Sequence, residues 1–140
     1  MAAMEEVRSP LADAVTRVGD RWTLLVVAAL LDGPRRFGEL AEQVPGIAPN
    51  ILTRRLRHLE DEGLVVARLY SERPRRFVYE LTEAGRELGG ALRLLAHWAA
   101  PEEGESPRHA VCGTALEARW FCPTCDRAVE DAEASELPFV

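Results

Sequence analysis

Residues 48–63, APNILTRRLRHLEDEG, decide the fold of this chain. Apolar side chains recur there at helical spacing, which places them on one face of a predicted helix. These side chains are Leu52, Leu56 and Leu59. The outward face carries Asn50, Thr53, Arg54 and Arg57. Pro49 suits the first helical position because a proline there loses no hydrogen bond, and Gly63 suits the C-terminal cap. The stretch therefore predicts an amphipathic helix that packs through its leucines and exposes its arginines.

Two strand-like runs, residues 64–70 and 77–81, follow this helix and predict a β-hairpin around the turn at residues 71–76. Residues 36–44 predict a short helix ahead of it, and the turn Pro45-Gly46-Ile47 joins the two helices. Two helices joined by a tight turn and followed by a hairpin make a winged helix-turn-helix. The predicted fold class is therefore mainly α with a small β-hairpin wing.

Three further helices complete the predicted domain. The first covers residues 11–18, and the second covers residues 22–31 with Asp20 as its N-cap. A long amphipathic helix runs from Thr82 to about Ala99. We expect three parts in all: a winged helix-turn-helix domain for DNA binding and dimerisation over residues 1–100, an acidic linker over 101–108, and a short zinc-ribbon-like segment with an acidic tail over 109–140.

Composition and charge narrow the class of protein. With 140 residues, 47% of them apolar, the chain can form one packed domain with a small appendage. The longest apolar run, residues 22–31, is shorter than the ~18 residues of a membrane helix, and the N-terminus lacks the pattern of a secretory signal. We therefore expect a cytoplasmic protein with no membrane partner.

The net charge of −6 is distributed unevenly. Residues 1–98 carry 14 Arg and 14 acidic residues, whereas residues 99–140 carry 3 Arg and 9 acidic residues. Residues 48–79 contain 7 Arg and only 4 acidic residues, so the helix and hairpin form a local basic surface. Such a surface is what binding to DNA phosphates requires, even in a protein that is acidic overall.

The basic surface predicts contacts with double-stranded DNA. Arginine can give two hydrogen bonds to guanine and asparagine can pair with adenine, each worth about 1–3 kcal/mol of discrimination. A charged helix face alone could simply be solvated, but the adjoining basic hairpin would meet the same duplex and favours DNA binding. The predicted DNA-binding residues are Pro49, Asn50, Thr53, Arg54, Arg57, Arg73, Arg75 and Arg76. No nucleophilic triad or phosphate-binding loop is visible, so we expect no catalytic residues and no enzyme.

The long C-terminal helix also predicts a homodimer. Its apolar stripe, from Ala84 to Ala99, exceeds what one small domain usually covers. With the helix over residues 11–18 it would form a dimer contact; the alternative is packing within the chain.

Three cysteines and a histidine form a second pattern, His109-x2-Cys112 followed by Cys122-x2-Cys125. Three thiolates and one imidazole can complete a tetrahedral zinc site, so we predict structural zinc with His109 as the fourth ligand. Asp126, His97 or water are the alternatives for that position. A redox dithiol is the competing interpretation, but no βαβ pattern surrounds the Cys-x-x-Cys pair.

These features together resemble the HxlR family of bacterial winged-helix transcriptional regulators over about residues 9–99. The matching stretches are Gly19–Leu25, Gly33–Leu40, Pro45–Ile47 with Leu52–Leu56, Leu59–Val65, and Tyr79–Gly85. The resemblance implies a homodimer that binds paired half-sites and regulates nearby genes, and we expect a repressor. Many family members have a thiol-sensing cysteine where this chain has Ser9, and tend to have serine where it has Ala48. The sequence does not identify an effector molecule.

Two alternatives for the function stay open at this point. The combination of winged helix and zinc ribbon also resembles archaeal transcription factor E, which would make the chain an interaction module of the transcription machinery. Alternatively, the chain is a regulator whose Cys/His cluster senses zinc or oxidants.

Overall fold

The computed structural model describes residues 9–100 and 107–134. The described residues form two compact units, one of residues 13–93 and one of residues 9–12 with 94–100 and 107–134. Within the described parts, no helix is both long enough and apolar enough to cross a membrane.

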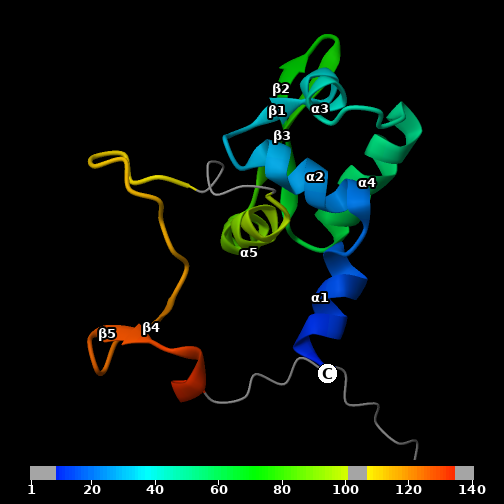
Figure 1. Cartoon of the computed structure of the whole chain (residues 1–140). Helices are drawn as coiled ribbons and strands as arrows, with labels where there is room; N and C mark the ends of the chain where they lie inside the picture. Colours follow the sequence, from blue (N-terminus) through cyan, green and yellow to red (C-terminus); the bar gives the residue numbers. More distant parts are fainter. Residues whose placement is uncertain (1–8, 101–106, 135–140) are drawn as a thin grey trace, which may run out of the picture. The chain divides into compact units, whose positions relative to one another are not determined.

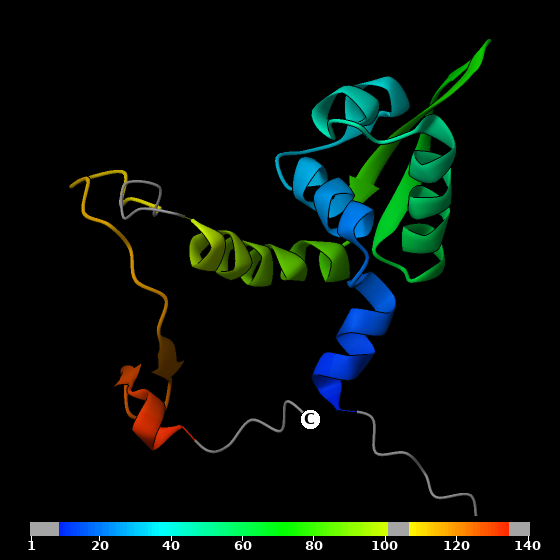
Figure 2. The same ribbon diagram turned by 45° about the vertical axis from the view of Figure 1, so that its right-hand side comes forward.

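The first unit is a helical domain with a three-stranded antiparallel sheet (Figure 1). The elements that contribute to it are α1 (Pro10–Val18), α2 (Arg21–Leu30), β1 (Arg35–Arg36), α3 (Phe37–Gln43), α4 (Pro49–Asp61), β2 (Val65–Glu72), β3 (Arg75–Leu81) and α5 (Glu83–Ala99). The strand order is β1-β3-β2, so the hairpin β2–β3 is extended at one edge by the short β1. The tip of the hairpin projects beyond the helices as a wing (Figures 1 and 2).

One hydrophobic core holds the helices to the base of the sheet. The largest fully buried side chains are Leu40, Leu52, Leu56, Leu59, Leu81, Val26, Val27, Val44 and Thr23. Three of them are the leucines that were predicted to form the inner face of the helix over residues 48–63, and that prediction is confirmed. Truncating such a leucine to alanine typically costs about 2–5 kcal/mol, so α4 is firmly seated in the domain.

Side-chain caps fix the beginnings of α1 and α2. The Asp20 carboxylate accepts hydrogen bonds from the backbone N–H groups of Trp22 (2.9 Å) and Thr23 (3.1 Å), as predicted. Ser9 accepts from the N–H of Ala12 at 3.0 Å, at the position where the family resemblance led us to look for a cysteine. The hydroxyl of residue 9 therefore serves as a helix cap.

The beginning of α5 is locked onto the junction between α4 and β2. The Thr82 hydroxyl donates to the Gly63 carbonyl (2.7 Å) and accepts from the Gly85 N–H (3.2 Å). The Thr82 N–H donates to the Leu64 carbonyl at 3.0 Å. A Cβ added to Gly85 would lie 2.2 Å from that same carbonyl oxygen, so the close approach requires glycine.

The predicted helices agree with the structure, but the sheet is larger than predicted. β1 was not predicted; it pairs Arg35 with Tyr79 and Arg36 with Val78. The two hairpin strands are also longer than expected, which reduces the predicted turn over residues 71–76 to Arg73-Pro74. The Arg73–Pro74 peptide is cis, as in a tight turn with proline at its third position.

The second unit contains a small hairpin near the C-terminus. Its strands β4 (Trp120–Cys122) and β5 (Arg127–Val129) are antiparallel, and a 3₁₀ turn, η2 (Asp131–Glu133), follows. Residues 101–106 of the predicted linker and residues 135–140 of the predicted tail lie outside the described residues.

Candidate nucleic-acid interface

α4 presents most of the predicted base-contacting side chains to solvent. Asn50, Arg54 and Arg57 are exposed, on the side opposite the buried leucines. Pro49 occupies the first turn and is also exposed. Thr53 differs from the others, because it is half-buried and its hydroxyl donates to the Pro49 carbonyl at 3.0 Å. The face available for reading bases therefore centres on one amide and two guanidinium groups.

His58 lies outside this face. Its Nε2 is 2.6 Å from the backbone carbonyl of Arg17, at the end of α1. The same end of α1 is held to the end of α4 by an ion pair between Arg17 and Glu62 at 2.6 Å. These contacts make this side of α4 a packing surface for α1.

The N-terminus of α4 carries no side-chain cap. Ala48 occupies the N-cap position with extended backbone and has no side-chain oxygen to accept a hydrogen bond. Pro49 has no N–H and the N–H of Ile51 donates to the Ala48 carbonyl at 3.0 Å, so in the first turn it is the N–H of Asn50 that can donate to solvent or to a ligand. Such a helix end, with its positive partial charge, favours an approaching phosphate.

The wing supplies the second basic element. Arg73, Arg75 and Arg76 are all exposed around the tip of the hairpin. A register shift between Leu69 and Ser71 gives β2 an extra residue, Tyr70, just before the tip. A bulge of this kind increases the local twist of a hairpin and re-aims the side chains beyond it.

Within residues 9–100, the arginines of the domain divide into those that form salt bridges and those that do not; the second group contains all the predicted DNA-binding arginines and also Arg21, Arg35, Arg36 and Arg93. Arg17, Arg55, Arg68 and Arg86 each pair with an acidic side chain. The arginines predicted to contact DNA have no such partner within the described parts of the chain; they are Arg54, Arg57, Arg73, Arg75 and Arg76. The paired arginines hold helices and strands together, whereas the unpaired ones keep their charge available for phosphates and base edges.

A shallow hollow between α3 and the wing adds a residue that the sequence analysis missed. The hollow has a volume of about 580 Å³, and Arg36, Tyr70 and Arg75 are among the residues that line it. The Arg36 guanidinium lies 5.0 Å from the centre of the Tyr70 ring. The sequence signal was the pair Arg35-Arg36, but only the pairing of β1 with β3 brings it to the wing.

Tyr79 contributes a neutral hydroxyl to the same hollow. Burial raises the pKa of Tyr79 above its ordinary value; the charge of Glu60 adds to this effect and that of Arg57 opposes it. The phenol therefore keeps its proton at neutral pH and can donate a hydrogen bond.

The four predicted zinc ligands lie in two pairs. His109 Nδ1 is 3.2 Å from Cys112 Sγ, and the N–H of Cys125 is 3.5 Å from Cys122 Sγ. The Thr114 hydroxyl and N–H, with His109, lower the pKa of the Cys112 thiol to about 7. Over residues 9–100 and 107–134, no three His, Cys, Asp or Glu side chains form a group that could hold a metal. A single four-ligand zinc centre is therefore not assembled in this structure, and zinc binding stays a prediction.

Comparison with known proteins places the domain among transcriptional regulators. The family model of the HxlR-like helix-turn-helix matches residues 17–106. An uncharacterized HTH-type transcriptional regulator of Mycobacterium bovis is 39% identical over 131 residues, which cover 89% of this chain and 82% of that protein. The HTH-type transcriptional regulator YodB of Bacillus subtilis is 33% identical over 102 residues, which cover 73% of this chain and 89% of YodB.

Solved structures agree with this placement. The reduced form of YodB superposes with a TM-score of 0.57 at 35% identity, over 64% of this chain and 89% of YodB. The redox regulator HypR in its reduced form gives a TM-score of 0.61 at 32% identity, over 64% of this chain and 89% of HypR. These relatives are regulators, so an interaction module of the transcription machinery is not favoured. The chain belongs to the HxlR-like helix-turn-helix family and is a DNA-binding transcriptional regulator.

Proposed function

We propose that this regulator binds operator DNA as a homodimer, with α4 of each protomer in the major groove and each wing on the flanking backbone. The observation that carries the proposal is the set of unpaired arginines on two adjoining elements. α4 packs against β2, so the helix and the wing belong to one rigid surface, and Figure 2 shows them on the same side of the domain.

We assign different roles to the two elements. Asn50, Arg54 and Arg57 are proposed to contact base edges, because α4 is a 13-residue helix of the kind that fits the major groove. Thr53 is proposed to contact the DNA backbone through its methyl group, since its hydroxyl is hydrogen-bonded within the helix. The wing arginines, together with Arg36, are proposed to bind phosphates or the minor groove, because they surround a projecting tip.

The dimer is proposed from the distribution of apolar side chains on α5. Leu88 and Leu92 pack against the core of their own chain, so this part of the stripe follows the alternative of packing within the chain. Further along the helix Leu94, Leu95 and Trp98 are exposed, Trp98 by 84%. An exposed tryptophan beside two exposed leucines is typical of a protein interface. Leu11 and Val15 of α1 are exposed as well and are proposed to take part.

A two-fold dimer predicts an inverted repeat as its operator. Its half-sites would be centred about 34–36 Å apart, one turn of B-DNA. A dimer that covers this length of a promoter excludes polymerase from it, so we propose repression as the mode of action. We propose the cytoplasm as the location, since the DNA lies there.

Two arginine variants test the assignment of roles. Arg54→Ala should weaken binding to the selected operator by about 5- to 150-fold for each half-site, because each protomer loses a base contact worth about 1–3 kcal/mol, with little effect on random duplex. Arg75→Ala should weaken binding to both duplexes and reduce the slope of log K against log salt by about 0.9 per protomer. Fluorescence anisotropy with labelled duplexes over a range of salt concentrations measures both quantities.

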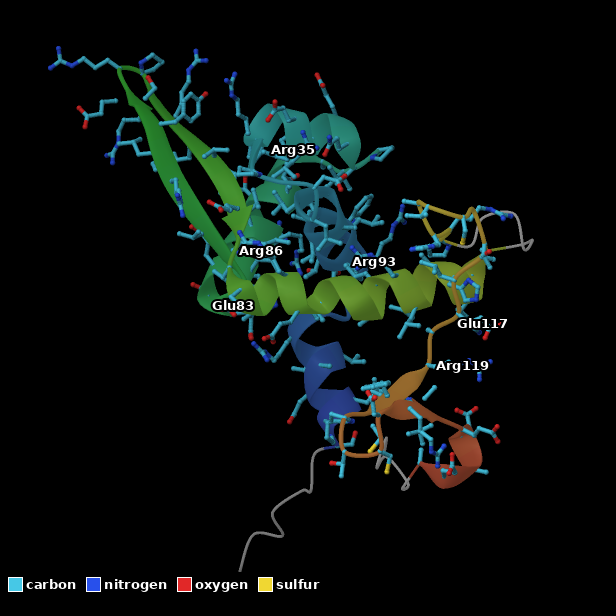
Figure 3. All side chains as sticks on the ribbon, turned by 90° about the vertical axis from the view of Figure 1, so that its left-hand side faces the viewer. Arg35, Glu83, Arg86, Arg93, Glu117 and Arg119 are labelled. Atoms are coloured by element: carbon cyan, nitrogen blue, oxygen red, sulfur yellow. The ribbon has the colours of Figure 1, made fainter. Side chains whose placement is uncertain are left out.

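Arg93→Ala is the matched control, because it removes the same charge from an exposed site. Figure 3 shows Arg93 beside α5, well apart from the wing. This variant should bind both duplexes as the wild type does. Equal losses on operator and random DNA for Arg54→Ala and Arg75→Ala would contradict the division between base reading and backbone binding.

A further inference from the structure

Two short turns in the second unit lie outside the proposed DNA-binding residues, and each of them presents two side chains of a type that binds metal. The first turn, residues 108–115, carries His109 and Cys112. The second, at the end of the β4–β5 hairpin, carries Cys122 and Cys125. We propose that these four side chains bind one structural zinc ion as a Cys₃His site.

The first turn already has the shape of a ligand-bearing loop. An antiparallel bridge between Arg108 and Ala115 closes it. Within it, the Gly113 N–H donates to the His109 carbonyl at 2.8 Å, and Gly113 has a φ of 72°. That left-handed conformation reverses the chain directly after Cys112, so the imidazole and the thiol lie on the same side, 3.2 Å apart.

The second turn has the same design with a different closing residue. Cys122 ends β4, Cys125 lies in the turn, and Asp126 takes the left-handed conformation with a φ of 53°. The N–H of Cys125 points to the sulfur of Cys122 at 3.5 Å. Backbone N–H groups that donate to sulfur stabilise a thiolate, which is the form that binds metal.

Packing alone does not explain why these turns are ordered. Among residues 107–134 no side chain is fully buried, and the large apolar ones are exposed, Val111 by 88% and Trp120 by 63%. A segment this small with no buried core needs another source of stability. A bound zinc ion supplies it, because the free energy of metal binding becomes free energy of folding.

One shared site requires the connection between the turns to change from its conformation in this structure. Residues 116–119 have no regular secondary structure, and the two pairs do not form one group in the described part of the second unit. A bend in this connector that brings the two turns together would place three sulfurs and one ring nitrogen at about 2.0–2.3 Å from a single zinc ion. Each thiol releases its proton to solvent as its Zn–S bond forms, so the site carries three thiolates and a neutral imidazole.

Metal analysis of the purified full-length chain, prepared without chelators, tests the proposal. We expect about one zinc per chain by mass spectrometry of the metal, and loss of at least nine-tenths of it in Cys122→Ser. Glu117→Gln is the matched control: Glu117 lies on the connector, pairs with Arg119 at 2.6 Å and is not a proposed ligand, and both residues are labelled in Figure 3. This variant should retain one zinc.

Cobalt substitution identifies the ligand set independently of the zinc content. Bound Co²⁺ should show the visible absorption of a tetrahedral ion and thiolate charge-transfer bands, which Cys112→Ser weakens. His109→Asn should lower zinc affinity at least tenfold, whereas Asp126→Asn should leave it unchanged.

Three results would overturn the proposal. The first is less than about one-tenth of a zinc per chain in a preparation whose three thiols are all reduced. The second is undiminished zinc in Cys122→Ser. The third is loss of zinc in Asp126→Asn but not in His109→Asn, which would reject His109 as the fourth ligand. Helical circular dichroism and DNA binding of each variant report on residues 13–93, so a failure of the zinc site is distinguishable from a failure of the DNA-binding domain.

Discussion

Replacement of Gly85 by alanine tests how α5 is attached to the DNA-binding domain. A Cβ at this position would meet the Leu64 carbonyl oxygen at 2.2 Å and Leu81 Cδ2 at 3.0 Å. The backbone of Leu64 cannot move freely, because its carbonyl also accepts the hydrogen bond from Thr82. The helix must therefore shift away from β2 to accommodate one methyl group.

The expected magnitude is the balance of two opposing effects. Alanine favours a helix over glycine by about 0.5–1 kcal/mol, which would stabilise the domain. Overpacking typically costs about 1–3 kcal/mol, and each backbone contact of Thr82 that is lost costs about 0.5–1.5 kcal/mol more. We therefore expect Gly85→Ala to lower the free energy of unfolding by about 1–3 kcal/mol. For a domain of this size the melting temperature should fall by about 4–8 °C per kcal/mol.

Gly90→Ala on the same helix is the control, because nothing lies within 4 Å of its added Cβ. It should stabilise the protein by about 0.5–1 kcal/mol, the helix-propensity effect alone. Urea unfolding followed by far-ultraviolet circular dichroism gives both values. If Gly85→Ala were as stable as Gly90→Ala, α5 would not be docked against Leu64 as described.

Three further predictions concern the helix caps and the dimer. Ala48→Ser should raise the free energy of unfolding by about 0.5–1 kcal/mol, since it gives α4 the missing cap; an unchanged urea midpoint would contradict this. Burial alone would raise the pKa of Asp20, but the N–H groups of Thr23 and Trp22 and the charge of Arg55 outweigh it and lower that pKa below 3.8. The ionised cap therefore adds stability above about pH 4, and this stability is lost as the pH falls through the folded-state pKa. The urea midpoints of wild type and Asp20→Asn should accordingly converge at low pH. A difference between them that stays constant with pH would reject the assignment. Trp98→Glu should shift the dimer to monomer in light scattering with the helical spectrum intact; a variant that remains dimeric would exclude α5 from the interface.

The sequence predicts the helices of this domain well, because its signals are local and agree with one another. The leucine spacing in residues 52–59 and the Asp20 cap each depend on a few neighbouring residues, and both are confirmed. The contribution of Arg36 to the interface could not be predicted in the same way. It depends on β1, a two-residue strand whose pairing with β3 joins positions about 40 residues apart.

The spacing of residues along a helix also does not predict which contacts each side chain makes. Thr53 lies on the outward stripe by its position, yet its hydroxyl bonds to the backbone four residues earlier, a common alternative for threonine in helices. The apolar stripe of α5 reads as one continuous surface in sequence. In the structure Leu88 and Leu92 pack on the core, where Gly85 and Gly89 permit close approach, whereas Leu95 and Trp98 are exposed.

The sequence that wild-type protein selects from random duplex DNA is the most direct test of the central claim, that two copies of α4 and its wing read one operator. The account predicts strong enrichment of an inverted repeat, with half-site centres separated by about one helical turn. Substitution of Arg54 should then change the preference at one position in each half-site, at the base pair that this arginine contacts. Recovery of sequences no different from the starting pool would contradict the account.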